Sequence, residues 1–243
     1  MKNAIGIRNV CGRHLFAGLL LLGLVGCESQ ALQDILTSQS SSSDSTIAAG
    51  LREALTVGSK QVVSTLGSEG GFSLSPSYRI PLPESLATAR SMANTVGLGG
   101  YFDTLENKMN EAAEAATPKA QELFLGAIRQ LTFTDVMDIY QGGDKAATTY
   151  LEDKTSSQLG AEMRPVIERS LNEVGAYSTF NTLIERYNAL PLVSDIDADL
   201  TGHVVRLAND AIFSELGKQE TAIRQDPARQ TTALLRQVFG SGG

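Results

Sequence analysis

The chain has 243 residues, a formal net charge of −7 and no tryptophan. An acidic surface repels phosphate backbones, so the composition argues against nucleic acid as a partner. Aromatic residues make up only 6% of the chain, which disfavours sites that recognise sugars or bases on exposed aromatic platforms.

Residues 1–26 have the pattern of a bacterial secretion signal. Three basic residues, Lys2, Arg8 and Arg13, precede an uncharged and leucine-rich run at 15–25. That run is much shorter than the roughly 20 residues that a membrane-spanning helix needs. It has the length of the apolar core of a signal peptide, so we expect residues 1–26 to be removed on export.

The signal ends in Leu24-Val25-Gly26-Cys27, which resembles the lipobox of bacterial lipoproteins. The resemblance implies cleavage between Gly26 and Cys27, a diacylglycerol on the cysteine sulfur and acylation of the new amino group. The partner at this end of the chain is then a membrane, reached through lipid. Glu28 follows the cysteine, where an aspartate favours retention in the inner membrane. We therefore expect a periplasm-facing protein of the cell envelope, on the outer rather than the inner membrane. The alternative is an ordinary secretory signal with an incidental cysteine.

The chain has two cysteines, Cys11 inside the signal and Cys27 at the cut. The processed protein would carry no free thiol and no disulfide. This excludes thiol catalysis, redox pairs and metal sites built on cysteine. Its stability must then come from packing.

Residues 27–46 separate the expected anchor from the rest of the chain. The stretch 37–46 is nearly all serine, threonine, glutamine and aspartate. Such a segment buries too little apolar area to offset its chain entropy, so it predicts a disordered tether. Residues 47–243 are the size of one domain with a substantial core.

Apolar residues recur at helical spacing through most of 47–243, which predicts an all-α domain. We expect an irregular bundle of roughly eight to ten helices, with extended pieces only near 72–74 and 78–81. The clearest apolar stripes lie at 101–116, 120–131, 163–174, 180–187, 204–212 and 234–239.

Several helix starts carry capping signals. Thr117 and Asp226 each stand directly before a proline, a combination favoured at the first helical position. Thr132 with Asp135 has the spacing of a capping box. We expect a helix to begin after each of these residues.

The motifs of common enzymes and metal sites are missing from the sequence. There is no GxSxG, SxxK or Walker A motif, and the processed chain has one histidine, His203, which we expect at the surface. Asp195, Asp197 and Asp199 alternate as in a calcium loop, but leucine and arginine stand where an EF-hand needs glycine and glutamate. We read them as an acidic loop that caps the next helix, and expect no metal and no cofactor.

Four charged residues lie on or beside apolar stripes and are the candidate polar cluster. Lys154 and Glu215 fall on stripes, so they should point partly inward and need partners. Arg164 and Glu106 lie at stripe edges and could supply them. One interpretation is a structural ion-pair network between helices. The other is the lining of a ligand cleft.

From residue 51 to residue 239 the sequence resembles the bacterial lipoprotein family catalogued as domain of unknown function 4197. The resemblance implies a helical lipoprotein and carries no known activity. The segments that carry it are LREAL at 51–55, VG at 57–58, RIPLP at 79–83, MNEAAEAA at 109–116, DKAAT at 144–148, Tyr150 with Lys154, RP at 164–165, LPLV at 190–193, and residues scattered through ETAIRQDPARQTTALLRQVFG at 220–240.

Three functions remain open from the sequence. The first is a non-enzymatic binding or scaffolding module of the envelope, with an envelope protein as a possible partner. The second is a carrier that holds an apolar or amphiphilic small ligand between helices. The third is an enzyme that uses the Lys, Arg and Glu cluster, which requires those side chains to converge in one solvent-reachable cleft.

Overall fold

A computed structural model describes the backbone of residues 28–95, 97–190, 196 and 198–240, and the side chains from residue 44 onward except that of Pro227. The signal peptide, Gly26 and the expected lipidation site Cys27 lie outside these residues, as do Asp195 and Asp197 of the acidic loop. The chain divides into two units, residues 1–42 and 43–243. The second unit holds the core and the sites described below.

The first helix, α1 (Glu28–Leu66), begins well before the expected domain boundary. The sequence predicts a disordered tether through residue 46, and the structure instead has a helix there. No glycine or proline stands between residues 28 and 49. Serine and glutamine each weaken a helix by only a fraction of a kcal/mol, and extending a helix that is already nucleated costs little.

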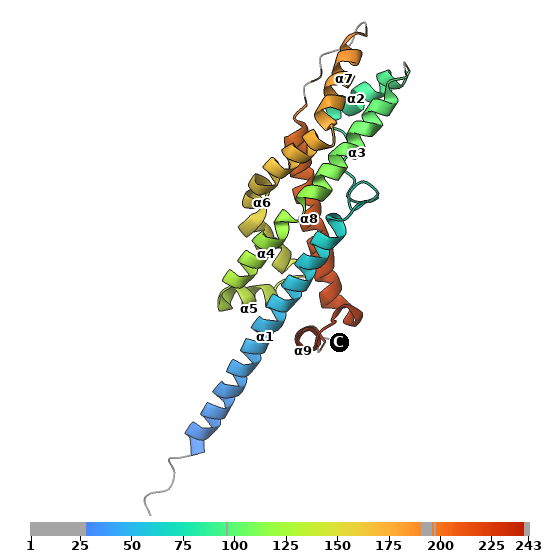
Figure 1. Ribbon diagram of the computed structural model, residues 1–243. Helices are drawn as coiled ribbons and strands as arrows, with labels where there is room; N and C mark the ends of the chain where they lie inside the picture. The colour runs from blue at the N-terminus through green and yellow to red at the C-terminus, as the bar shows by residue number, and fades with distance from the viewer. Residues whose placement is uncertain (1–27, 96, 191–195, 197, 241–243) are drawn as a thin grey trace, which may run out of the picture. The chain divides into compact units, whose positions relative to one another are not determined.

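Helices make up almost all of the remaining described chain, as Figure 1 shows. The described residues form nine α-helices and one 3₁₀ turn, with no strand, which confirms the all-α multi-helix prediction. After α1 come α2 (Glu84–Asn94), α3 (Gly99–Ala116), α4 (Lys119–Gln130), α5 (Phe133–Gln141), α6 (Ala146–Glu173), α7 (Ala176–Asn188), α8 (Leu200–Gln225), the 3₁₀ turn (Pro227–Arg229) and α9 (Ala233–Phe239).

The core is organised around α6, which packs against α3, α4, α5, α7 and α8. Its buried positions recur about every four residues, with Thr155 between Leu151 and Leu159. Met163, Ile167 and Leu171 of the predicted stripe are fully enclosed. Each buried leucine or methionine contributes about 1.5–3 kcal/mol relative to an exposed one. The buried apolar residues of α6 are Ala147, Leu151, Leu159, Met163, Ile167 and Leu171.

Two of the predicted caps form. Thr132 accepts a hydrogen bond from the Asp135 amide, and the Asp135 carboxylate accepts one from the Thr132 amide at 2.8 Å, which completes the capping box of α5. Asp199 caps α8 by accepting a hydrogen bond from the Gly202 amide at 2.8 Å. The last of the three alternating aspartates therefore caps a helix, as the acidic-loop interpretation expects.

At the other two expected starts, α4 begins at Lys119 and a 3₁₀ turn at Pro227, but the capping or the type of helix differs. The Thr117 hydroxyl donates to the Ala113 carbonyl at 2.9 Å, so this threonine closes α3 and does not cap α4. The Asp226 carboxylate accepts a hydrogen bond from the Ala228 amide, and this opens a 3₁₀ turn rather than a long helix. Helix α9 is capped by Thr232 instead.

The segment between α1 and α2 includes a loop at 72–83 that is fastened to two helices. Residues 72–74 form a turn, so the extended piece expected there is absent, and 79–83 are non-helical without pairing as a strand. The Glu114 carboxylate accepts hydrogen bonds from the Phe72 and Ser73 amides at 3.0 and 2.9 Å. On the α8 side, the His203 ring nitrogen Nε2 lies 2.8 Å from the Pro81 carbonyl oxygen.

Asn110 makes the most buried attachment of this loop. Its side-chain oxygen accepts from the Ile80 amide at 2.8 Å, and its side-chain nitrogen donates to the Ile80 carbonyl at 2.9 Å. Both residues are at most 1% exposed. One amide side chain thus replaces the strand partner that this piece of backbone lacks.

Replacing Asn110 with alanine should lower the free energy of unfolding by about 2–4 kcal/mol, because the Ile80 amide and carbonyl would stay buried without partners. Urea denaturation measures this change. Asn107→Ala is the control, since Asn107 is exposed on the same helix and bonds only the Arg79 side chain. It should cost less than about 0.5 kcal/mol. Equal effects of the two substitutions would show that the Ile80 attachment is unimportant.

Candidate functional site

The two basic residues of the candidate polar cluster are both exposed on α6. Lys154 does not point inward: its ammonium lies 5.6 Å from the centre of the Tyr150 ring, and Thr155 takes the buried position beside it. Arg164 follows ten residues later, about 15 Å along the helix axis. Their side chains therefore occupy different stretches of the surface.

The two acidic residues bind the 72–83 loop. Glu106 forms ion pairs with Arg79 at 2.6 Å and with Arg90 at 3.2 Å. Glu215 is buried and accepts a hydrogen bond from the Tyr78 hydroxyl at 2.7 Å. Burial raises the pKa of Tyr78, so its hydroxyl remains protonated and can donate.

The structure thus separates the four predicted residues. Lys154 and Arg164 contact neither Glu106 nor Glu215 among the ion pairs and hydrogen bonds of the described chain. The enzyme hypothesis needed all four in one cleft, and that arrangement is absent from the described residues. Glu106 and Glu215 both have structural partners, on the 72–83 loop and α2. None of these partners is a member of the predicted cluster.

Two hollows in the bundle are of interest. The first, which we call the Glu220 cavity, has a volume of about 20 Å³ and lies between α1, α6, α8 and α9. The second, the α4–α6 groove, has a volume of about 440 Å³ and opens to solvent. A space of 20 Å³ holds one water molecule at most, so the Glu220 cavity is a packing feature.

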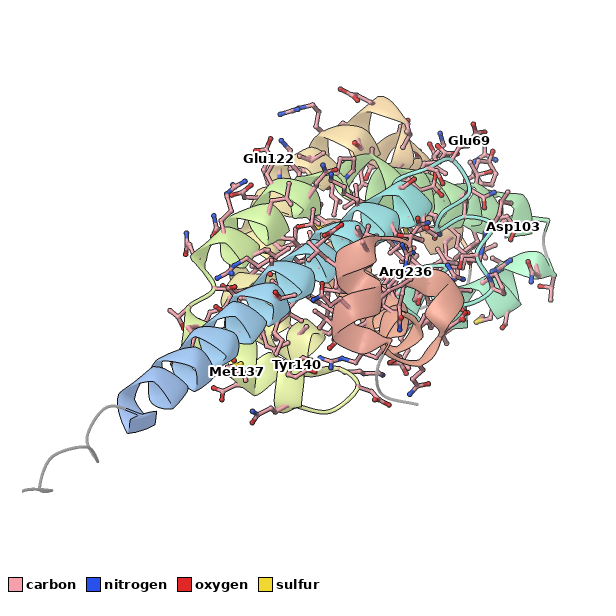
Figure 2. The ribbon with its side chains drawn as sticks, turned by 90° about the horizontal axis from the view of Figure 1, so that it is seen from below. Glu69, Asp103, Glu122, Met137, Tyr140 and Arg236 are labelled. Atoms are coloured by element: carbon pink, nitrogen blue, oxygen red, sulfur yellow. The ribbon has the colours of Figure 1, made fainter. Side chains whose placement is uncertain are left out.

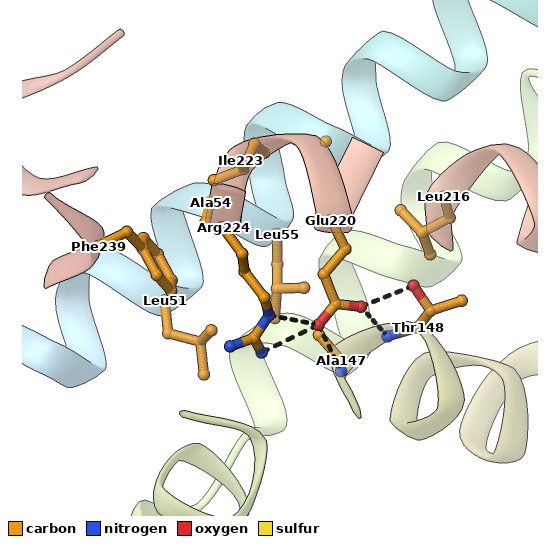
Figure 3. A pocket seen from close by; sticks show the side chains of 11 residues that line it. Leu51, Ala54, Leu55, Ala147, Thr148, Leu216, Glu220, Ile223, Arg224 and Phe239 are labelled. Carbon is orange, nitrogen blue, oxygen red and sulfur yellow. Dashed lines mark hydrogen bonds and ion pairs between the residues drawn. The ribbon is translucent and has the colours of Figure 1, made fainter. Parts of the chain in front are cut away.

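The Glu220 carboxylate binds the start of α6 (Figure 3). One oxygen accepts from the Ala147 amide at 3.0 Å, and the other accepts from the Thr148 amide and hydroxyl, both at 2.8 Å. Arg224 pairs with the same carboxylate at 2.9 Å and donates to the Ile139 carbonyl at the end of α5. A negative charge is favourable at a helix N-terminus and a positive one at a C-terminus. This pair therefore joins α5, α6 and α8.

The α4–α6 groove is the larger opening and includes Lys154. Its walls are α4 and α6, and the start of α5 closes one end. The lining residues are Glu122, Leu123, Gly126, Ala127 and Gln130 from α4, Thr132 and Asp135 at the start of α5, and Tyr150, Lys154, Thr155 and Gln158 from α6.

The two walls run in opposite directions. Thr132, just after α4, bonds Asp135, whose carboxylate lies 3.5 Å from the hydroxyl of Tyr150 near the start of α6. The end of α4 therefore lies beside the beginning of α6 (Figure 1). Glu122 of α4 and Gln158 of α6 also line the groove.

The acid and the phenol at one end of the groove have pKa values shifted in opposite directions. Hydrogen bonds from the Thr132 side chain and backbone lower the pKa of Asp135, and the Lys154 charge lowers it further. Burial raises the pKa of Tyr150, and the neighbouring Asp135 charge adds to the effect. Near neutral pH the groove thus presents a fixed carboxylate and a neutral hydroxyl donor. A general acid or base would instead need a pKa close to the working pH.

Gly126 keeps the middle of the groove open. It lies inside α4, where glycine weakens a helix by about 0.5–1 kcal/mol relative to alanine. A Cβ atom at this position would meet no atom within 4 Å, so no neighbouring helix requires the glycine. The space above Gly126 is the groove itself.

The sequence predicted some members of these sites and missed others. It singled out Lys154 for a buried position that the residue does not take, and Asp135 only as a helix cap. It missed Glu220 and Arg224, although a carboxylate four residues before an arginine on one helix is a recognisable pair. Gly126 could have been found as a glycine inside an otherwise strong helical pattern.

The family model described as a protein of unknown function, DUF4197, matches residues 41–240. The chain belongs to this family. No curated protein and no solved structure matches it. The lining of the Glu220 cavity comes almost entirely from three of the segments that carry the resemblance to the family, 51–58, 144–148 and 220–240. They converge on a structural junction, while Tyr150 and Lys154 lie in the groove.

No helix among the described residues is both long enough and apolar enough to cross a bilayer. No group of three or more histidine, cysteine, aspartate or glutamate side chains in the same residues is placed to hold a metal ion.

Glu220→Gln should lower the free energy of unfolding by about 2–4 kcal/mol. The glutamine amide has one accepting oxygen where the carboxylate has two, and it leaves the Arg224 charge uncompensated. Thermal and urea unfolding measure the loss. Gln225→Ala is the matched control, since Gln225 is exposed one turn further along α8 and bonds only Asp144. If both variants unfold like the parent chain, the junction does not hold the three helices together.

Proposed function

We propose that this protein is a lipid-anchored, periplasm-facing lipoprotein whose domain binds a small ligand in the α4–α6 groove without transforming it. The open groove, with no neighbour that requires Gly126, is the observation that carries the binding role. Its volume lies within the roughly 300–1,000 Å³ of small-molecule sites. The fixed carboxylate and neutral phenol favour binding over acid–base chemistry.

A small ligand has more support than a protein partner. Protein-binding surfaces present contiguous apolar patches of several hundred Å². The large apolar side chains exposed on the described surface are Leu74, Met92 and Phe133, which lie on the 72–83 loop, on α2 and on α5. They do not share an element. The carrier hypothesis, which expects a hollow between helices with a few polar groups, fits the groove better.

The anchor is supported by the sequence of the first 27 residues. The basic start, the apolar run and the Gly26-Cys27 cut site occur in the order of a lipoprotein signal. Two or more acyl chains, at about 0.8 kcal/mol per buried CH₂, make a lasting attachment. The Glu28 residue after the cysteine favours the outer membrane.

Cys27→Ser should abolish labelling with radioactive palmitate and release the protein from the membrane fraction, because serine cannot carry the thioether-linked lipid. Circular dichroism of the released protein should match that of the parent chain. Cys11→Ser is the control, since it removes a cysteine from the expected signal and leaves the cut site intact. Retention of Cys27→Ser in the membrane fraction would refute the anchor.

Gly126→Ala should raise the free energy of unfolding by about 0.5–1 kcal/mol, because alanine favours the helix and its Cβ meets open space. Gly126→Leu should fold as well but fill the groove. A small-molecule extract of the envelope should then raise the melting temperature of the parent chain and not that of Gly126→Leu.

Gly160→Ala is the matched control for this test. It makes a similar change inside α6, outside the groove lining, where a Cβ has an ordinary contact of 3.7 Å with Val205. It should keep the response to the extract. An extract that stabilises Gly126→Leu as much as the parent chain would show that ligands do not bind in the groove.

A further inference from the structure

The groove contains one cation and one anion without ionic partners. Lys154 and Glu122 both line it, and neither forms an ion pair within 4.0 Å with any of the described residues. The third charged group, Asp135, already accepts hydrogen bonds from Thr132 and Tyr150. A ligand that pairs with both Lys154 and Glu122 must carry both an anionic and a cationic group.

The two charges stand on different walls of the groove. Glu122 lies on α4, one turn before Gly126, and Lys154 lies on α6. A ligand that pairs with both must therefore reach across the groove.

Figure 2 shows Glu122 at the outer edge of the domain, on the side of α4. Its carboxylate is exposed, as is the Lys154 ammonium. Both charges thus stand at the rim, where they can meet the two ends of a ligand that lies in the groove.

The uncharged lining suits a peptide between those ends. Gln130 and the carbonyl of Gln158, whose amide donates to Glu162, offer hydrogen-bonding groups for backbone amides. Leu123 and Ala127, on either side of Gly126, give an apolar floor for one side chain. A purely aliphatic acid would not pair with Glu122 and would make no hydrogen bond to the side-chain amides of the lining.

We infer that the ligand is a short peptide with free ends, a dipeptide in its smallest form. Its carboxylate pairs with Lys154, and its ammonium pairs with Glu122. This inference rests on the proposed binding function and adds the chemical class of the ligand to it.

The test uses the purified full chain, labelled with ¹⁵N, and the dipeptide alanyl-leucine. The unblocked dipeptide should shift the backbone amide signals of Gly126 and Lys154 in a saturable manner. Amidation of its carboxyl end, or acetylation of its amino end, should each weaken binding about threefold or more, as expected for the loss of one solvent-accessible ion pair. Equal binding of all three forms would overturn the inference.

Two substitutions assign each end of the peptide to its partner. Lys154→Gln should bind the amidated and free-acid peptides equally, while it still discriminates against acetylation. Glu122→Gln should show the opposite pattern. Each comparison is a double-mutant cycle, so a change in fold alone would not reproduce the crossed result. Loss of both discriminations in either variant would contradict the assignment.

The outcome also separates this inference from the proposed function. If the envelope extract stabilises the parent chain but not Gly126→Leu, and the dipeptide causes no shift, the groove binds a ligand of another class and the peptide inference fails alone. If neither the extract nor the dipeptide has an effect on the parent chain, both fail.

Discussion

The hydrogen bonds of the Glu220 carboxylate to the start of α6 are the contact on which the bundle depends most. Helix α6 touches five other helices, so its position sets theirs. The carboxylate satisfies the Ala147 and Thr148 amides, which the helix cannot pair itself, and Arg224 extends the contact to α5. Because α6 and the start of α5 also line the groove, the same junction positions the candidate binding site.

Other helix ends are closed in the same manner, by charged side chains from distant parts of the sequence. Arg52 of α1 donates to the Leu131 carbonyl at the end of α4. Lys108 of α3 donates to the Val174 carbonyl at the end of α6. Positive charge at a helix C-terminus opposes the helix dipole and also satisfies a free carbonyl. The expected processed chain has no disulfide, so these contacts and the apolar core fix how the helices are arranged.

Local signals in the sequence predicted local structure well. Apolar spacing identified the helices and their buried faces, and the Thr132 box marked the start of α5, because both depend on residues within one turn. The spacing could not say which helix meets which. It therefore missed the Asn110 attachment and the Glu220 junction, and one step of 100° around α6 separates exposed Lys154 from buried Thr155. Likewise, a serine-rich composition predicted disorder over 28–46 but could not exclude a helix extending backwards.

The groove depends on a residue, Gly126, that selection for higher thermostability would replace. Natural proteins leave stability unused where function requires a weaker choice, and screens for thermostability find those positions. A library of this chain selected only for heat resistance should therefore accept larger helix-forming residues at position 126 early. Their side chains would fill the groove as the stability of the selected variants increased. The same substitution would increase the stability of helix α4 and remove the space in the groove. Stability and the proposed binding are thus in direct competition at one position of α4.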